Sequence, residues 1–240
     1  MTMAGGGGGG ARAGMVHLTR LLQFSDSALP IGSFAFSNGL ESALQTGVVS
    51  DAESLLAYVE LILRQAARMD GIALLHAHRA VLAGDYCAVL EADAELHCRR
   101  VGEEQSLMLT RVGKKFAELV LKITPTPTLE RWLGDIRADV TPGCFPVGQA
   151  IALAEMGVDE AEAFVMHQYG VATMILSAAL RLMRIDHIGT QRILFAAQER
   201  VEGDYLAVRD LSLEEMASFA PIFDVLVAHH VTTHVRLFMN

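Results

Sequence analysis

The sequence has little positive charge. Its 19 lysines and arginines stand against 28 aspartates and glutamates, so the formal net charge is −9 over 240 residues. A protein that binds nucleic acid needs a basic stripe to neutralise phosphates. The acidic balance therefore argues against a nucleic-acid partner.

Cysteine is scarce. The three cysteines, Cys87, Cys98 and Cys144, lie far apart and form no CxxC pair. An odd, scattered set fits a reducing compartment better than a disulfide framework. We therefore expect a cytoplasmic protein.

Long hydrophobic runs are missing as well. The most apolar stretch, residues 171–180, is too short to span a bilayer and ends at Arg181. Arg12 is not followed by the apolar segment of a secretory signal. The chain should not enter a membrane, yet 52% of its residues are hydrophobic. Such a surplus is often covered by a protein partner.

Catalytic motifs are absent from the sequence. There is no GxxxxGK[ST], HExxH or GxSxG, and Gly113-Lys114-Lys115 lacks both the upstream glycine and the hydroxyl of a phosphate loop. We therefore predict that the protein is not an enzyme.

Helical periodicity dominates what is present. Apolar residues recur at helical spacing, capping residues precede them, and alternating strand patterns are nearly absent. The fold class is all-α, a single compact domain of about ten helices. Residues 1–15 contain a glycine run and should be a flexible tail, so the domain covers residues 16–240. The proline-rich segment 124–127 could divide it, but the second half alone would bury its long apolar helix poorly.

Several helix boundaries follow from local patterns. Asn38 with Glu41 and Ser50 with Glu53 predict helix starts, and Asp70-Gly71 predicts a break. Asp159 with Glu162 should open the longest apolar helix, which we expect to be central. Later helices are expected over residues 191–202 and from residue 222 to about residue 238.

The least generic stretch lies between the first two predicted helices. Residues 26–39, here called the elbow, carry Pro30, Gly32 and two aromatics, Phe34 and Phe36. Pro30 prevents a helix from passing through. The aromatics can pin the turn into the core, or the rigid loop can present them as a recognition surface. Spacing alone does not decide between the two.

Two polar features near the ends of helices also admit two interpretations. His230 and His234 are four residues apart with His229 adjacent, which suits a metal site, although no third ligand is evident and a solvated or partner-facing terminal helix explains them equally simply. Arg181 ends an apolar helix, where it can neutralise the helix dipole or join a buried ion pair.

Three segments resemble one known family. Residues 28–41, ALPIGSFAFSNGLE, are similar to the ALPxGxFxxSxGLE element of the urease accessory protein UreF family. Residues 181–182 and 191–194 are similar to its RL…PLGQxxGQxIL segment. His230 and residues 236–238 resemble its closing HExxxxRLF. Order and spacing agree from residue 21 to the C-terminus.

The sequence also departs from that pattern. Residues 184–187 read Arg-Ile-Asp-His where the family usually has Pro-Leu-Gly-Gln. Thr190 replaces the glycine before the second glutamine, and Val231 replaces the glutamate after His230. The first two changes concern the loop before residue 191, and all three leave the expected fold untouched.

The resemblance implies an all-helical homodimer that matures nickel urease. Such a protein is an adaptor that bridges UreD (also called UreH) and the GTPase UreG, and assists GTP-dependent nickel delivery to the urease apoprotein. It binds no cofactor directly, because nickel and GTP act through its partners. The residues expected to meet partners are Pro30, Gly32, Ser33, Phe34, Phe36, Ser37, Gly39, Glu41, Arg181, Gln191, His230, Arg236, Leu237 and Phe238.

Two alternatives remain within this resemblance. The protein could regulate UreG directly by supplying Gln191, Arg181 or Arg184 to its active site, since a supplied arginine stabilises phosphoryl-transfer charge. It could instead be a nickel-binding chaperone that uses His229, His230 and His234. Residues 16–24 and 236–240 are expected to become ordered when UreD binds.

Overall fold

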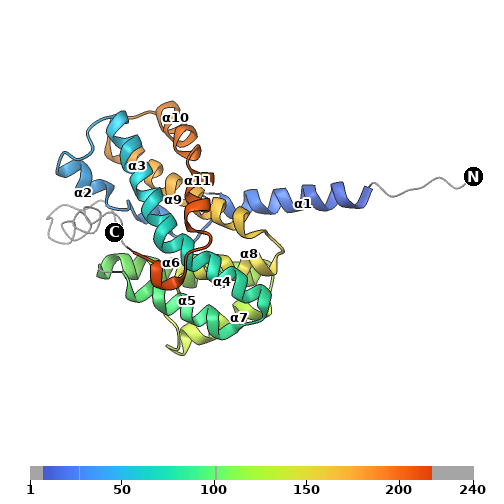
Figure 1. Cartoon of the computed structure of the whole chain (residues 1–240). Coiled ribbons are helices and arrows are strands. Elements are labelled where there is room, and N and C mark those ends of the chain that lie inside the picture. Colours follow the sequence, from blue (N-terminus) through green and yellow to red (C-terminus); the bar gives the residue numbers. More distant parts are fainter. Residues whose placement is uncertain (1–7, 27, 101, 218–240) are drawn as a thin grey trace, which may run out of the picture.

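The computed structural model describes residues 8–26, 28–100 and 102–217. In these ranges the chain is helical and contains no strand, which confirms the all-α class. Figure 1 shows the helices packed into one body. The helices before residue 99 are α1 (Gly8–Ser25), η1 (Ser33–Ala35), α2 (Leu40–Gln45), α3 (Ala52–Ala66), η2 (Ala67–Gly71), α4 (Ile72–Ala83) and α5 (Tyr86–Cys98). Those after it are α6 (Glu103–Ile123), α7 (Pro127–Arg137), α8 (Phe145–Glu155), α9 (Glu160–Leu182), α10 (His187–Gln198), α11 (Val201–Val208) and η3 (Leu213–Glu215).

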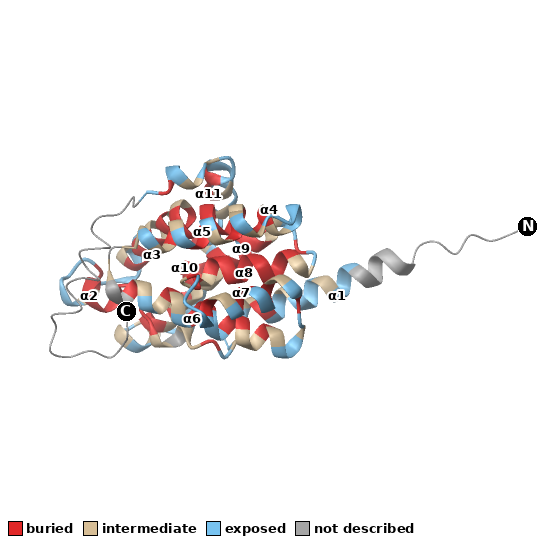
Figure 2. Cartoon of the chain, turned by 90° about the horizontal axis from the view of Figure 1, so that it is seen from below, coloured by how far each residue is buried: buried red, intermediate tan, exposed pale blue. Residues whose placement is uncertain are grey.

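Two apolar clusters form the core. In one, α4 packs on α8 and α5, and α6 packs on α8; in the other, α3, α9 and α10 pack together. Helix α9 joins them, because Phe164 belongs to the first cluster and Ile175 to the second. Asp159 and Glu162 form its capping box, as predicted. The buried residues therefore concentrate along the middle of the body (Figure 2).

Helix α9 is also long and apolar enough, by length and composition alone, to cross a membrane. However, 61% of its most apolar window is buried inside the protein. The packing of both core clusters against α9 accounts for this apolar character without a bilayer.

The predicted break at Asp70-Gly71 is wrong. Helix α3 continues through the π-helical turn η2 into α4, with helical backbone angles on both sides of the turn. Gly71 serves close packing, since a Cβ there would lie 2.6 Å from Cε2 of Phe164. The extra residue of the π turn shifts which side chains face the core.

Some other boundaries also differ from prediction. Gly39, in the left-handed conformation, is the N-cap of α2 in place of Asn38. Asp51 with Ser54 forms the capping box of α3, one residue beyond the predicted pair. Asp186 caps α10 by accepting a hydrogen bond from the backbone N–H of Gly189, so α10 begins before residue 191. Helix α11 continues through Gly203, beyond the predicted end at residue 202. The predicted final helix lies outside the described residues.

The N-terminal prediction also needs correction. Residues 8–15, expected to be a flexible tail, form the first turns of α1, while residues 1–7 lie outside the described part. Continuation of a helix through glycines costs only about 0.5–1 kcal/mol per residue, so the glycine run does not by itself prevent it. Helix α1 projects from the body toward the N-terminus (Figure 1), tethered near its C-terminal half by His17, whose Nε2 lies 3.0 Å from Oε2 of Glu162.

Candidate functional site

The elbow is a compact turn between α1 and α2. Gly32 has φ +82° and Gly39 φ +75°, a region that other residues enter at a cost. The short helix η1 lies between them. On the far side, the Tyr58 hydroxyl donates to the backbone oxygen of Asn38 at 2.6 Å. The two glycines and this hydrogen bond fix the path of the chain.

Burial divides the predicted partner residues of the elbow. Pro30 is exposed, and Gly32 and Ser33 are half-buried. Phe36 is 5% exposed and belongs to the core, so at this position the core interpretation holds. The side chain of Phe34 is not described. The members that lie in the interior and support the turn from within are Phe36, Ser37, Gly39 and Glu41.

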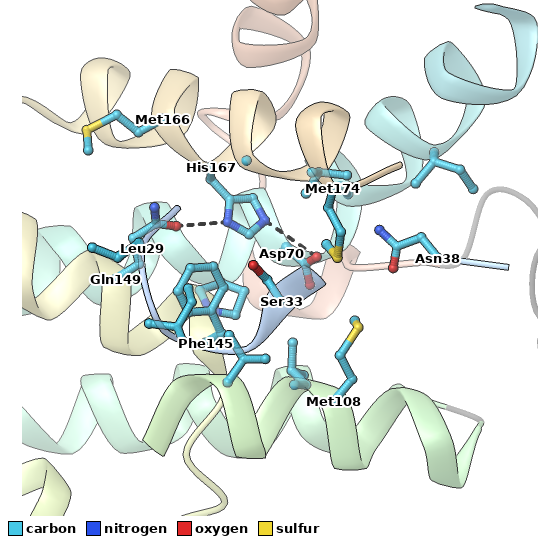
Figure 3. A pocket seen from close by; sticks show the side chains of 18 of the residues that line it. Leu29, Ser33, Asn38, Asp70, Met108, Phe145, Gln149, Met166, His167 and Met174 are labelled. Atoms are coloured by element: carbon cyan, nitrogen blue, oxygen red, sulfur yellow. Dashed lines mark hydrogen bonds and ion pairs between the residues drawn. The ribbon is translucent and has the colours of Figure 1, made fainter. Parts of the chain in front are cut away.

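A cavity of about 130 Å³ lies beneath the elbow. Leu29, Ser33 and Asn38 line it from the elbow, and Met108 and Met174 line it from α6 and α9 (Figure 3). Most of its wall is apolar. Because the elbow forms part of this wall, a movement of the elbow would reshape the cavity.

A polar centre faces this cavity. Arg100 forms an ion pair with Oδ1 of Asp70, and Nε2 of His167 lies 3.5 Å from Oδ2 of the same carboxylate. Nδ1 of His167 lies 2.9 Å from Oε1 of Gln149 (Figure 3). Gln105, which is 4% exposed, also lines the cavity, and neither polar atom of its side chain makes a hydrogen bond to a described residue.

The charges in this centre act on the Asp70 carboxyl in opposite directions. Burial raises its pKa, but the Arg100 charge and the hydrogen bond and charge of His167 outweigh burial, so the pKa lies below its ordinary value. Asp70 is thus held as a carboxylate. The π turn η2 carries it and orients it toward α5–α6 and α9.

A second buried carboxylate lies between α5 and the connection from α7 to α8. Asp93 on α5 accepts hydrogen bonds from Trp132 Nε1 at 3.1 Å and Thr141 Oγ1 at 2.6 Å. It also accepts from the backbone N–H groups of Gly143 at 3.0 Å and Cys144 at 2.7 Å. Burial, and next the Asp93 charge, raise the pKa of the Cys144 thiol. This carboxylate holds α7 and the turn before α8 in place.

The remaining predicted residues lie elsewhere. Arg181 is exposed in the last turn of α9 and donates from Nε to the backbone oxygen of Ser177 at 3.3 Å, which supports the dipole interpretation. Gln191 is exposed on α10, and neither residue lines the cavity. Within the described ranges no three His, Cys, Asp or Glu side chains group as metal ligands. The predicted residues outside the described part are His229, His230, His234, Arg236, Leu237 and Phe238.

Sequence reasoning missed the polar centre. The local pattern at Asp70 predicts a helix break, and no sequence motif marks Arg100, His167 or Gln149. A usable signal was present, because Asp70 continues the helical spacing of Leu63 and Ala66 on the inner face. A charged residue on an apolar face predicts a buried partner.

Comparison with known proteins bears on this site. The UreF family model matches residues 49–198. The urease accessory protein UreF of Yersinia enterocolitica serotype O:8 / biotype 1B is 48% identical over 225 residues, which cover 93% of this chain and 98% of that protein. The urease accessory protein UreF of Yersinia pseudotuberculosis serotype IB is 47% identical over the same shares. Residues 28–41, which include most of the elbow over this cavity, carry the motif that resembles the same family, and the chain belongs to the UreF family of urease accessory proteins.

Proposed function

We propose that this protein is a non-enzymatic adaptor of urease maturation in the cytoplasm, which bridges UreD (UreH) and the GTPase UreG for GTP-dependent nickel insertion into apo-urease. The observation that carries the proposal is similarity to urease accessory proteins over 93% of the chain. The elbow supplies a rigid surface with Pro30 exposed and Ser33 half-buried. Rigid loops of this kind reduce the entropy lost on binding.

Helix α1 supports the same proposal. Met15, Leu18 and Leu22 are 63%, 57% and 64% exposed and recur at helical spacing. A projecting helix with an exposed apolar stripe is the form of a segment that a partner covers. We assign this stripe, together with residues 236–240, to UreD.

Co-expression with UreD and UreG tests the proposal. We expect the tagged chain to retain both proteins, and the purified chain alone to hydrolyse no GTP above background. Met15→Glu/Leu18→Glu should lose UreD without loss of helicity, whereas the exposed-site control Arg20→Glu should retain it. Failure of the native chain to retain either protein, or GTP turnover without UreG, would overturn the adaptor assignment.

A direct role in UreG hydrolysis is the second candidate. Arg181, Arg184 and Gln191 are exposed around the α9–α10 connection, so they can reach a partner. Single substitutions to alanine should then lower the GTP hydrolysis rate of UreG in the complex while UreG remains bound. Unchanged GTP hydrolysis in all three variants would contradict this second candidate, and only the adaptor role would remain.

Self-association belongs to the proposal as well. Val165 on α9 and Leu206 on α11 are 49% and 52% exposed and line one apolar groove. We assign the α9–α11 part of this groove to a second copy of the chain. Light scattering should show a dimer at micromolar concentration, and Val165→Glu/Leu206→Glu should give a folded monomer. A native chain that stays monomeric would contradict the assignment.

A further inference from the structure

We propose that the cavity beneath the elbow is a binding site for a small monocarboxylate. The inference rests on the charges, the unpaired donors and the volume of that cavity. It does not depend on the adaptor role, because binding of a small ligand is measured on the isolated chain.

The first step is the charge of the polar centre. The Arg100 guanidinium, which is always charged, is the cation of this centre, and Asp70 is its ion-pair partner. Beside them, Nδ1 of His167 lies 2.9 Å from Oε1 of Gln149 and its Nε2 lies 3.5 Å from Oδ2 of Asp70. The guanidinium gives this wall of the cavity a cation that attracts an anionic ligand. Asp26 also lines the cavity but is exposed, where water screens it.

The second step is the set of unpaired donors. The Gln105 amide nitrogen and Nε of Arg100 are buried and have no hydrogen-bond partner among the described residues. Buried donors are normally satisfied by a hydrogen bond. A carboxylate accepts several hydrogen bonds, and its charge is attracted by the guanidinium, so it can accept from both donors at once.

The third step is size and polarity. An apolar cavity of about 150 Å³ holds benzene, a molecule of six heavy atoms. The cavity of about 130 Å³ therefore limits the ligand to about five heavy atoms. Leu29, Met108 and Met174 line it with apolar atoms that suit a short alkyl chain. A carboxylate of the size of propionate fits these limits.

The position of the cavity gives binding a structural consequence. The ligand would touch the centre that η2 supports and, through Leu29 and Ser33, the elbow that covers it. A ligand that binds only the folded state stabilises that state by mass action. Occupancy should therefore stiffen the elbow.

The test is a titration of the full chain with sodium propionate, followed by thermal unfolding and by ligand-observed NMR. Propionamide is the neutral control of matched shape, and sodium chloride controls for ionic strength. At ten times Kd we expect propionate to raise Tm by about 3–5 °C. We expect no saturable change with propionamide. An equal response to propionamide or to chloride, or no saturable response to propionate up to roughly 0.1 M, would overturn the proposal.

A matched pair of variants locates the site. Gln105→Glu places a carboxylate in the cavity, and charge repulsion should weaken the binding of propionate at least about tenfold. Gln198→Glu makes the same change at an exposed position on α10 and should leave the affinity unchanged. If Gln105→Glu does not fold, Gln105→Leu, which removes the donor, replaces it and should weaken binding several-fold. Equal affinities in the cavity variant and the control would place propionate elsewhere and overturn the inference.

Discussion

Asp93 and Asp70 are both buried carboxylates, but their surroundings differ. Asp93 accepts four hydrogen bonds from Trp132, Thr141, Gly143 and Cys144, all at normal length. Asp70 meets one arginine and one histidine at the wall of a cavity, next to groups with no described partner. The first arrangement is complete, and the second is incomplete among the residues that the structure describes.

The two carboxylates therefore have different roles, one in holding the structure and the other in a candidate binding site. A fully satisfied buried carboxylate fixes the geometry of its neighbours and has no capacity left for a ligand. An incomplete centre beside a cavity and under a motif-bearing loop is where binding is expected. The predictions below test this contrast in order of expected effect.

The largest effect is expected at Asp93. Asp93→Ala leaves two side-chain donors and two backbone N–H groups buried without their acceptor, which should cost about 4–5 kcal/mol of unfolding free energy. At roughly 2–4 °C per kcal/mol for a chain of this size, Tm should fall by about 10 °C or more. Asp210→Ala, at an exposed aspartate, is the control and should change Tm little. Similar losses in the two variants would refute the role given to Asp93.

A smaller loss, about 3 kcal/mol, is expected for Asp70→Asn, because it leaves the Arg100 charge buried without its counterion. The double variant Asp70→Leu/Arg100→Met should recover part of that loss, since it removes both charges together. Two of the donors to Asp93 are backbone N–H groups, so no single partner substitution can rescue Asp93→Ala. Urea denaturation of the native chain, Asp70→Leu, Arg100→Met and the double variant measures the coupling between the two residues. Strict additivity at Asp70 and Arg100 would contradict the pairing.

The contribution of Asp70 to the free energy of unfolding should depend on pH. Its pKa is lowered in the folded protein, so the carboxylate contributes stability above its unfolded pKa of about 3.9 and loses that contribution as pH falls through the lower folded value. The free-energy difference between the native chain and Asp70→Asn should therefore be constant near neutral pH and shrink below about pH 4. Urea denaturation over that range measures it. A difference independent of pH would show that the carboxylate is not stabilised by its charge partners.

Local residue patterns predicted much of the fold. The Asp159–Glu162 box opens α9 as predicted, and the same local capping chemistry explains why Gly84 ends α4 and Asp85 caps α5. These features depend on neighbours in sequence. The π turn could not be found in this way, because the close contact of Gly71 with Phe164 joins residues far apart in the chain.

The candidate site was predictable only in part. The elbow stood out by its proline, glycines and aromatics, but the burial of Phe36 and Ser37 depends on the packing of the whole body. Arg100 and His167 come from distant segments, and only the fold brings both to Asp70. The sequence pattern marks Asp70 as a charged residue on an apolar helix face, but it does not identify the residues that pair with it.

The central claim is that the elbow presents a recognition surface as well as a core turn. The direct test is Tm and co-purification with UreD and UreG, measured together for Pro30→Trp, at the exposed position of the elbow, and for Phe36→Ala. Phe36→Ala removes a buried ring and should cost about 3–5 kcal/mol. We expect Pro30→Trp to keep Tm within about 2 °C of the native value, a loss of less than about 1 kcal/mol, yet to lose a partner. Retention of both partners by Pro30→Trp, or partner loss only in proportion to lost stability across both variants, would contradict the claim.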